Sequence, residues 1–348
     1  MKKLFSQTWF TVLLILGLSA LALGLALYDS FDTVIETLTN INPFTFIIFA
    51  IWGLVPFMLQ GFILSLMAKH LYPAYRFHEG FINALVGGFM SGVTPSSTGG
   101  QVAQTYTFKK QGLKSSQGAG LIWLDYFLYT ISLVVLASLL FLTNVSEFAH
   151  SSITLVFGLG LTVNILIIVF LGLMVFFPKV YRRLMTSLIH FSEKIKLVKQ
   201  KGKIVEGWHK ILDHFYEAQS VITENRSLLG KIFGLNLARL LVYFATPLII
   251  GLFLQLEIHW NQVIHLIALA SFVSIANTFV PLPGAAGATE SLFVLTFSTV
   301  IGKASAASIM ILWRFFSFYQ ILLIGGILFF KVRHQSDKEI QDEESTYY

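Results

Sequence analysis

One pattern occurs twice in this chain, and it constrains the fold more than any other feature. Each copy has a long apolar segment, a pair of shorter apolar segments separated by a Pro/Gly-rich break, and another long apolar segment. The first copy covers residues 43–142 with its break at 95–101, and the second covers 228–330 with its break at 281–290. Interrupted hydrophobic segments at matching places in two halves are typical of transporter folds with a site near the bilayer midplane.

The composition predicts an all-α integral membrane protein. Hydrophobic residues make up 55% of the chain and charged residues only 12%, which a water-soluble globule of this length does not show. A helix needs about 20 apolar residues to cross the ~30 Å hydrocarbon core. Six segments reach this length: 8–28, 43–68, 119–142, 153–177, 228–254 and 305–330. The segments 79–94, 100–111, 262–280 and 286–301 beside the breaks are shorter or more polar, so tilted spans and re-entrant half-helices both remain open.

The distribution of Lys and Arg predicts the orientation, because these residues accumulate in cytoplasmic loops. Ten of the 24 fall between residues 179 and 226. When the spans are threaded, the same side receives Lys2, Lys3, Lys69, Arg76, Lys109, Lys110, Lys114, Lys331 and Arg333, and the opposite side receives Asp29, Asp32, Glu36, Glu147 and Glu257. Only Lys303 departs from this pattern. The two copies then cross the membrane in opposite directions, as inverted repeats do. Any bundle with an even number of spans also produces some alternation of this kind by chance.

The predicted organisation places additional segments around the two repeats. A first transmembrane helix and outer loop occupy 1–42, a further helix occupies 143–178, and a cytoplasmic tail occupies 331–348. Residues 179–227 form a basic amphipathic segment at the cytoplasmic leaflet. An ordinary positively charged connecting loop explains this segment equally well.

Each break is expected to start a new helix. Pro95, Pro281 and Pro283 cannot continue a helix, and neighbouring glycines permit a sharp reversal. Thr98 and Gln101 have the spacing of a capping box. The N-terminus of a helix buried at mid-depth attracts a phosphate or carboxylate, although a plain packed turn explains the same residues. The candidate path residues at the breaks are Thr98, Gly99, Gly100, Gln101, Pro281, Pro283, Gly284 and Gly287.

Ionisable residues are few inside the apolar segments, and the candidates for a functional role are Asp125, Arg239, Glu290 and Arg314. Charges at this depth are costly, so they are usually paired or functional. One hypothesis is that they pair as structural ion bridges. The other is that Arg239 and Arg314 line a path for a lipid headgroup, because an Arg fork matches phosphate oxygens, and that Glu290 keeps these arginines poised when the path is empty.

Several chemistries have no support in the sequence. The chain has no cysteine, which excludes disulfides and thiolate chemistry. It has no nucleotide-binding loop, no nucleophile elbow and no metal-ligand spacing of histidines. We therefore expect no catalytic residues, no metal, no cofactor and no nucleic-acid partner.

The break sequences resemble a known family. Two stretches are similar to the hallmarks of the lysylphosphatidylglycerol synthase transmembrane family, the flippase-like domains typified by the membrane half of the multiple peptide resistance factor. They are Thr94-Pro95-Ser96-Ser97-Thr98-Gly99-Gly100-Gln101 and Pro281-Leu282-Pro283-Gly284-Ala285-Ala286-Gly287-Ala288-Thr289-Glu290. The resemblance covers about residues 10–330. Many members have Gly-Glu where this chain has Gly100-Gln101, and bifunctional members continue into a soluble lysyltransferase domain that residues 331–348 do not resemble.

The resemblance implies a lipid flippase or scramblase in a bacterial-type plasma membrane, with many spans and with both termini cytoplasmic. The expected partners are membrane lipids: an anionic or aminoacylated phospholipid, or a glycolipid. A second copy of the chain or a lipid-synthesis enzyme is a further possible partner. Two alternatives stay open, a phosphatidylglycerol lysyltransferase-type enzyme and a scaffold for lipid synthesis.

Overall fold

The computed structural model describes residues 41–145, 152–177, 224–278 and 280–346, with isolated positions in 35–39, in 179–187 and at 216. The predicted first helix at 8–28 and most of the basic segment 179–227 lie outside these residues. The described part is helical and contains no strand. Its elements are α3 (Pro43–Ala68), α4 (Phe77–Val93), η1 (Pro95–Ser97), α5 (Gly99–Lys110), α6 (Ser115–Leu142), α8 (Ser152–Phe176), α11 (Arg226–Phe253), α12 (Trp260–Asn277), η2 (Pro283–Ala285), α13 (Ala288–Ile301), α14 (Lys303–Arg314), η3 (Phe315–Tyr319) and α15 (Gln320–Thr346).

The predicted fold class, an all-α integral membrane protein, is confirmed. Within the described ranges, six helices are long and apolar enough to cross a membrane. Five of them coincide with the predicted segments 43–68, 119–142, 153–177, 228–254 and 305–330. The sixth, Pro283–Ile301, includes the second break.

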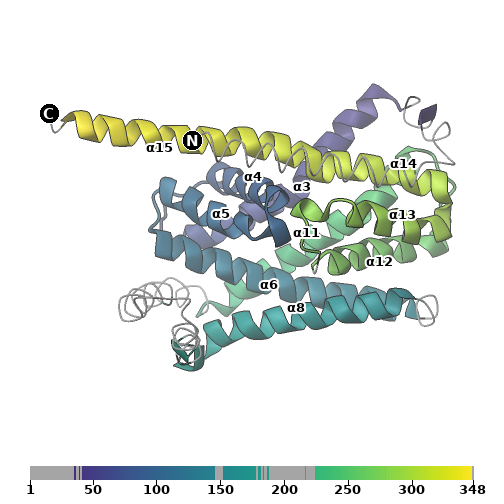
Figure 1. Cartoon of the computed structure of the whole chain (residues 1–348), viewed down its shortest axis with the longest axis horizontal. Coiled ribbons are helices and arrows are strands. Elements are labelled where there is room, and N and C mark those ends of the chain that lie inside the picture. The colour runs from purple at the N-terminus through teal and green to yellow at the C-terminus, as the bar shows by residue number, and fades with distance from the viewer. Residues whose placement is uncertain are drawn as a thin grey trace, which may run out of the picture.

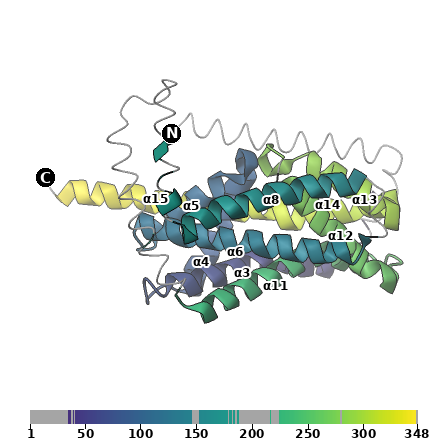
Figure 2. The same ribbon diagram turned by 90° about the horizontal axis from the view of Figure 1, so that it is seen from below.

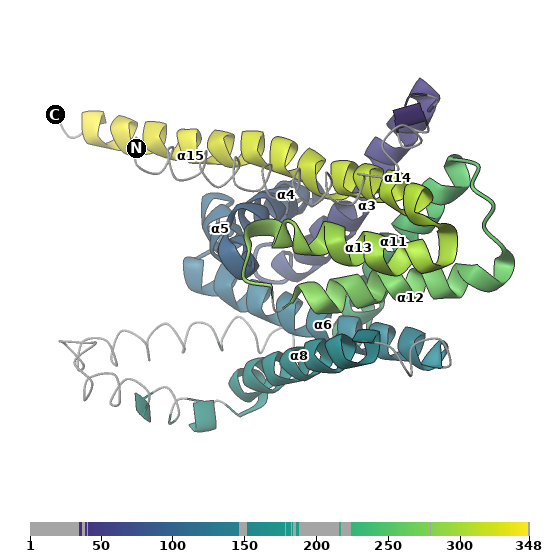
Figure 3. The ribbon, with the colours of Figure 1, turned by 45° about the vertical axis from the view of Figure 1, so that its right-hand side comes forward.

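The same order of elements appears in both copies. A long helix is followed by a hairpin whose two arms are separated by a short 3₁₀ turn, and then by another long helix. The α4–η1–α5 hairpin enters the bundle from one end and the α12–η2–α13 hairpin from the other (Figure 1). Their tips, η1 and η2, contact each other in the middle. The turned views show α6 running along the bundle beside α8 and α12 (Figures 2 and 3).

Helix lengths decide between tilted spans and re-entrant half-helices for the second arms of the hairpins. At about 1.5 Å per residue, the 12 residues of α5 rise about 18 Å and the 14 residues of α13 rise about 21 Å. Both lengths are well below the ~30 Å hydrocarbon core. These arms are therefore half-helices that begin at the tips inside the bundle, and the candidate span Pro283–Ile301 reaches its 19 residues only with the turn before α13.

Small residues allow the first hairpin to approach the long helices closely. A side chain at Gly80 would collide with the Gly61 carbonyl of α3, and one at Gly61 would collide with the backbone of Phe81. Close contact through small residues is a common way of packing helices in a membrane. It places α4, and the break that follows it, directly against α3.

Candidate functional site

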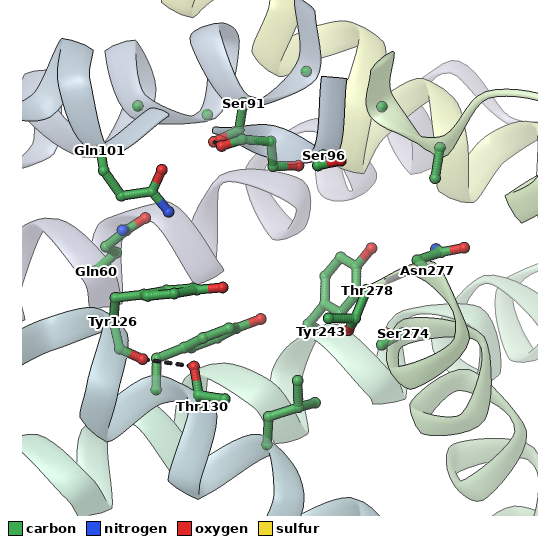
Figure 4. Close-up of a pocket in the computed structure, with 18 of the residues that line it drawn as sticks. Gln60, Ser91, Ser96, Gln101, Tyr126, Thr130, Tyr243, Ser274, Asn277 and Thr278 are labelled. Atoms are coloured by element: carbon green, nitrogen blue, oxygen red, sulfur yellow. Dashed lines mark hydrogen bonds between the residues drawn. The ribbon is translucent and has the colours of Figure 1, made fainter. Parts of the chain in front are cut away.

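A cavity of about 400 Å³ lies where the two hairpin tips meet. Both tips contribute to its wall, as do the long helices α3, α6 and α11 and the α14–η3 segment. Figure 4 shows Ser91, Ser96 and Gln101 of the first hairpin facing Gln60, Tyr126 and Thr130, with Tyr243, Ser274, Asn277 and Thr278 on the remaining side. A polar cavity at the centre of an apolar bundle is the arrangement expected of a ligand site rather than of simple helix packing.

The two breaks share one backbone geometry. Each 3₁₀ turn begins with a proline, Pro95 or Pro283, and the next two residues have positive φ: 51° and 57° at Ser96 and Ser97, and 58° and 49° at Gly284 and Ala285. This left-handed conformation costs an L-residue other than glycine about 1–2 kcal/mol. Strain of this kind persists where the surroundings determine it, and it is concentrated at functional sites.

The predicted capping box at the first break is wrong. Thr98 occupies the N-cap position of α5, but its hydroxyl donates to the Pro95 carbonyl (3.1 Å) and accepts no hydrogen bond from a backbone amide of the helix. Thr94 supplies the cap, because the left-handed turn brings its Oγ1 to the Gly99 amide (2.9 Å). The side-chain amide of Gln101 points back towards the Thr98 and Ser97 carbonyls, and the surrounding acceptors assign its nitrogen, rather than its oxygen, to face them.

The second break is held by a buried ion pair. Glu290 Oε2 accepts from the Gly287 amide at 2.7 Å, and Oε1 accepts from Arg314 Nε at 2.7 Å. The side chains of Arg314 and Glu290 are 8% and 1% exposed. Arg314 Nη2 also donates to the Gly284 carbonyl at 3.1 Å. Arg314 thus joins the tip of the second hairpin to the long helix that follows it.

A π-helical turn completes this arrangement. The helix α14 changes to π geometry over Phe315–Tyr319, directly after Arg314. The turn places the Phe318 ring 4.2 Å from the Arg314 guanidinium and against Gly284. A side chain at Gly284 would collide with this ring, so glycine is required there both for space and for its φ of 58°. Single π-turns inside α-helices frequently occur at functional sites.

Arg239 has different surroundings. It projects from α11 into the cavity, donates from Nη2 to Gln60 Oε1 at 3.0 Å, and lies 4.8 Å above the Tyr129 ring. It forms no salt bridge with a carboxylate in the described ranges. Asp125, one helical turn before Tyr129 on α6, is close to Arg239 and to the Gln60 and Asn236 amides. Its Oδ1 is buried without a hydrogen-bond partner in this part of the chain.

The charged residues lie at matching depths in the two copies. Asp125 is the eleventh residue of α6 and Arg314 the twelfth of α14. At about 1.5 Å per residue, both lie about 15–17 Å from the start of the helix, which is half the thickness of a ~30 Å hydrocarbon core. The cavity therefore lies at mid-depth if the bundle axis is the membrane normal.

The structure brings together some of the predicted path residues and not others. Asp125, Arg239, Arg314, Gln101 and Gly284 line the cavity. Glu290 lies behind Arg314, outside the lining. The remaining predicted residues belong to the breaks without lining the cavity: Thr98, Gly99, Gly100, Pro281, Pro283 and Gly287.

Sequence reasoning missed several residues of the wall, notably Gln60, Tyr126, Tyr129 and Tyr243. A signal for one of them was available, because Gln60 is the one amide side chain in the apolar segment 43–68. The tyrosines gave no such signal, since an aromatic residue in a membrane helix is as easily packed against lipid. The described residues hold no cluster of His, Asp and Glu able to bind a metal ion.

These features define a class: a multi-pass helical membrane protein with a polar site between two re-entrant hairpins. The chain belongs to the family described as lysylphosphatidylglycerol synthase TM region, whose model matches residues 10–325. The match includes both breaks and all four ionisable residues of the site. No curated protein matches the chain. The family membership associates the protein with membrane lipids.

Proposed function

We propose that the protein is a flippase or scramblase that moves the headgroup of a phospholipid, aminoacyl-phospholipid or glycolipid between leaflets. One observation carries this proposal: the polar cavity lies between hairpin tips that arrive from opposite ends of the bundle. A site at this position needs only a short movement of one tip or the other to open towards either face. Inverted-repeat transporters use this principle for alternating access.

The size and polarity of the cavity favour a headgroup as the ligand. About 400 Å³ is within the range of small-molecule sites, roughly 300–1,000 Å³, and is too small for a whole two-chain lipid. The first tip is exposed at Ser96 and Ser97. Apolar side chains next to the tips, Val102 and Leu282, are 71% and 38% exposed. A lipid can place its headgroup in the cavity while its acyl chains stay against this apolar surface.

The charge distribution supports an orientation in a plasma membrane. Lys69 and Arg76 lie between α3 and α4, and Lys109 and Lys114 lie at the α5–α6 connection, all at the end where the first hairpin enters. By the positive-inside rule this end is cytoplasmic. The start of α11 at Arg226 and the end of the long helix after Lys331 fall on the same side, so the C-terminus is cytoplasmic in this proposal. The predicted first helix crosses the membrane once before α3, which makes the N-terminus cytoplasmic as well.

The experiment is headgroup transfer in vesicles. The purified chain is reconstituted with fluorescent phospholipids that differ in headgroup, and a membrane-impermeant quencher reports the fraction in the outer leaflet. We expect protein-dependent exchange without ATP and no change in lipid mass. Absence of exchange for every lipid tested contradicts the proposal. A covalently altered lipid would indicate a transferase, and co-purification with a lipid synthase without exchange would indicate a scaffold.

A further inference from the structure

We infer that the two arginines of the cavity have separate tasks: Arg239 binds the phosphate of the headgroup, whereas Arg314 is a positioning residue that fastens the second hairpin. This inference rests on the proposed function, because it names the anion-binding group of the same cavity. The inference follows from which N–H donors of each guanidinium already form hydrogen bonds, and from the groups that accept them.

Arg314 is engaged along its Nε–Nη2 edge and on one face of its guanidinium. Its Nε contacts a carboxylate oxygen of Glu290, its Nη2 contacts the Gly284 carbonyl, and the Phe318 ring covers its face. The Glu290 carboxylate is itself bound to the Gly287 amide. A phosphate that binds the Nε–Nη2 edge would have to displace a buried carboxylate at hydrogen-bond distance. Removing one partner of such a pair leaves the other charge buried without compensation.

Arg239 is available to a ligand. A guanidinium has about five N–H donors, and the described residues accept from Arg239 through one of them, at the neutral Gln60 amide. The side chain is half-buried and lines the cavity. Tyr129 supports one face of the guanidinium and fixes its plane. The remaining donors keep the fork geometry that binds two phosphate oxygens at once.

Asp125 places a carboxyl group beside Arg239 in the cavity. Asp125 is 4% exposed and lies close to Arg239 but does not form a salt bridge with it. In its ionised form Asp125 repels a phosphate on Arg239, and this repulsion is weaker for a monoanion than for a dianion. A phosphodiester, the linkage in phospholipid headgroups, carries one negative charge. Asp125 therefore limits affinity and assists release.

The test is binding of a short-chain phospholipid to the full-length protein in detergent. Dihexanoyl-phosphatidylglycerol is titrated by calorimetry, with dihexanoylglycerol as the phosphate-free probe and inorganic phosphate as the lipid-free probe. Arg239→Ala and Arg239→Lys should each weaken binding of the phospholipid about tenfold or more, because a charge-assisted bidentate contact is lost. Asp125→Asn should tighten it. Lys231→Ala, an exposed change on the same helix, should change neither binding nor melting temperature.

The role of Arg314 is tested by a second readout. Arg314→Lys should lower the melting temperature while the phospholipid affinity, measured well below that temperature, stays within about twofold of wild type, since a lysine cannot make the same contacts to Glu290 and Gly284. Wild-type affinity in a folded Arg239→Ala protein overturns the inference. So does loss of affinity in Arg314→Lys at an unchanged melting temperature. Binding of inorganic phosphate as tight as that of the lipid would indicate a free anion as the ligand and overturns the assignment to a headgroup.

The outcomes separate this inference from the proposed function. If the wild type binds the lipid through Arg239 but transfers none in vesicles, the flippase proposal fails and the phosphate site stands. If the wild type transfers lipid and Arg239→Ala transfers it at the same rate with unchanged affinity, the flippase proposal stands and the phosphate site fails.

Discussion

The two hairpin tips have the same break but differ in how they are held. At both tips a proline is followed by two residues of positive φ, and then a half-helix begins. The second tip is fastened by the buried pair Glu290–Arg314 and covered by Phe318. The first tip has the neutral Gln101 at the corresponding third position of its half-helix, and it is exposed from Pro95 to Thr98.

This difference indicates that the two hairpins have different roles in transport. An ion pair fixes the second tip to the long helix after it, so this tip is suited to act as a rigid wall. The hydrogen bonds at the first tip, such as that between Thr94 and Gly99, join residues of the same hairpin, so they do not oppose displacement of the hairpin as a unit. We expect the first hairpin to move more easily than the second during a transport cycle.

The largest expected effect comes from breaking the ion pair at the second tip. Arg314→Ala should destabilise the protein by about 3–5 kcal/mol, because Glu290 would stay buried without compensation. The measurement is thermal unfolding in detergent. The double variant Glu290→Gln with Arg314→Met should recover most of the loss. A single variant as stable as the wild type would show that the pair does not fasten this tip.

The second effect concerns the positive-φ position that differs between the tips. Gly284→Ala should destabilise by about 2 kcal/mol, since the new methyl group combines left-handed strain with the contact to Phe318. The corresponding change in the first tip, Ser96→Gly, should stabilise by about 0.5–1 kcal/mol, because glycine relieves the strain at a φ of 51°. Equal effects of the same sign at both positions would contradict the described backbone.

A smaller effect distinguishes the true cap of the first half-helix from the residue at the N-cap position. Thr94→Val removes the oxygen that accepts from the Gly99 amide, and should cost about 1 kcal/mol. Thr98→Val is the matched control and should cost less than about 0.5 kcal/mol, because this hydroxyl is exposed and caps no amide. The reverse order of the two melting temperatures would restore the capping box predicted from the sequence.

The smallest effect is expected from making the first tip resemble the second. Gln101→Glu places a carboxylate at the third position of α5, where the helix dipole favours it by about 0.3–1 kcal/mol. The melting temperature should rise slightly. Because no arginine of the following helix α6 meets this position, the gain should be far below the loss caused by Arg314→Ala. A gain of similar size would mean that the two tips are not held differently.

The sequence was a good guide to the helices and to the breaks. The segment 43–68 coincides with α3, and 119–142 differs from α6 only at its first residues, because long apolar stretches leave a helix as the only way to satisfy the backbone in a membrane. Both breaks were predictable for a similarly local reason, because proline cannot continue a helix and glycine permits a sharp reversal. The π-turn at Phe315–Tyr319 was not predictable, since it depends on the packing of Phe318 against Gly284 and Arg314.

The partners of the charged residues were less accessible to sequence reasoning. Asp125, Arg239, Glu290 and Arg314 stand out in any reading of the apolar segments. Which of them touch depends on how α11, α13 and α14 are arranged in space. Sequence spacing also favoured Thr98 as the cap, whereas the strained conformation of Ser96 and Ser97 brings Thr94 to that role.

The most direct test of the account is to join the two tips and measure transport. The chain contains no cysteine, so Ser96→Cys with Ala285→Cys gives one pair to link with a short bifunctional maleimide. Because η1 and η2 are in contact, the link should form within one chain and stop headgroup transfer, while each single variant with the reagent keeps its rate. Transfer at the unlinked rate in fully linked protein would contradict the claim that the headgroup passes between the tips.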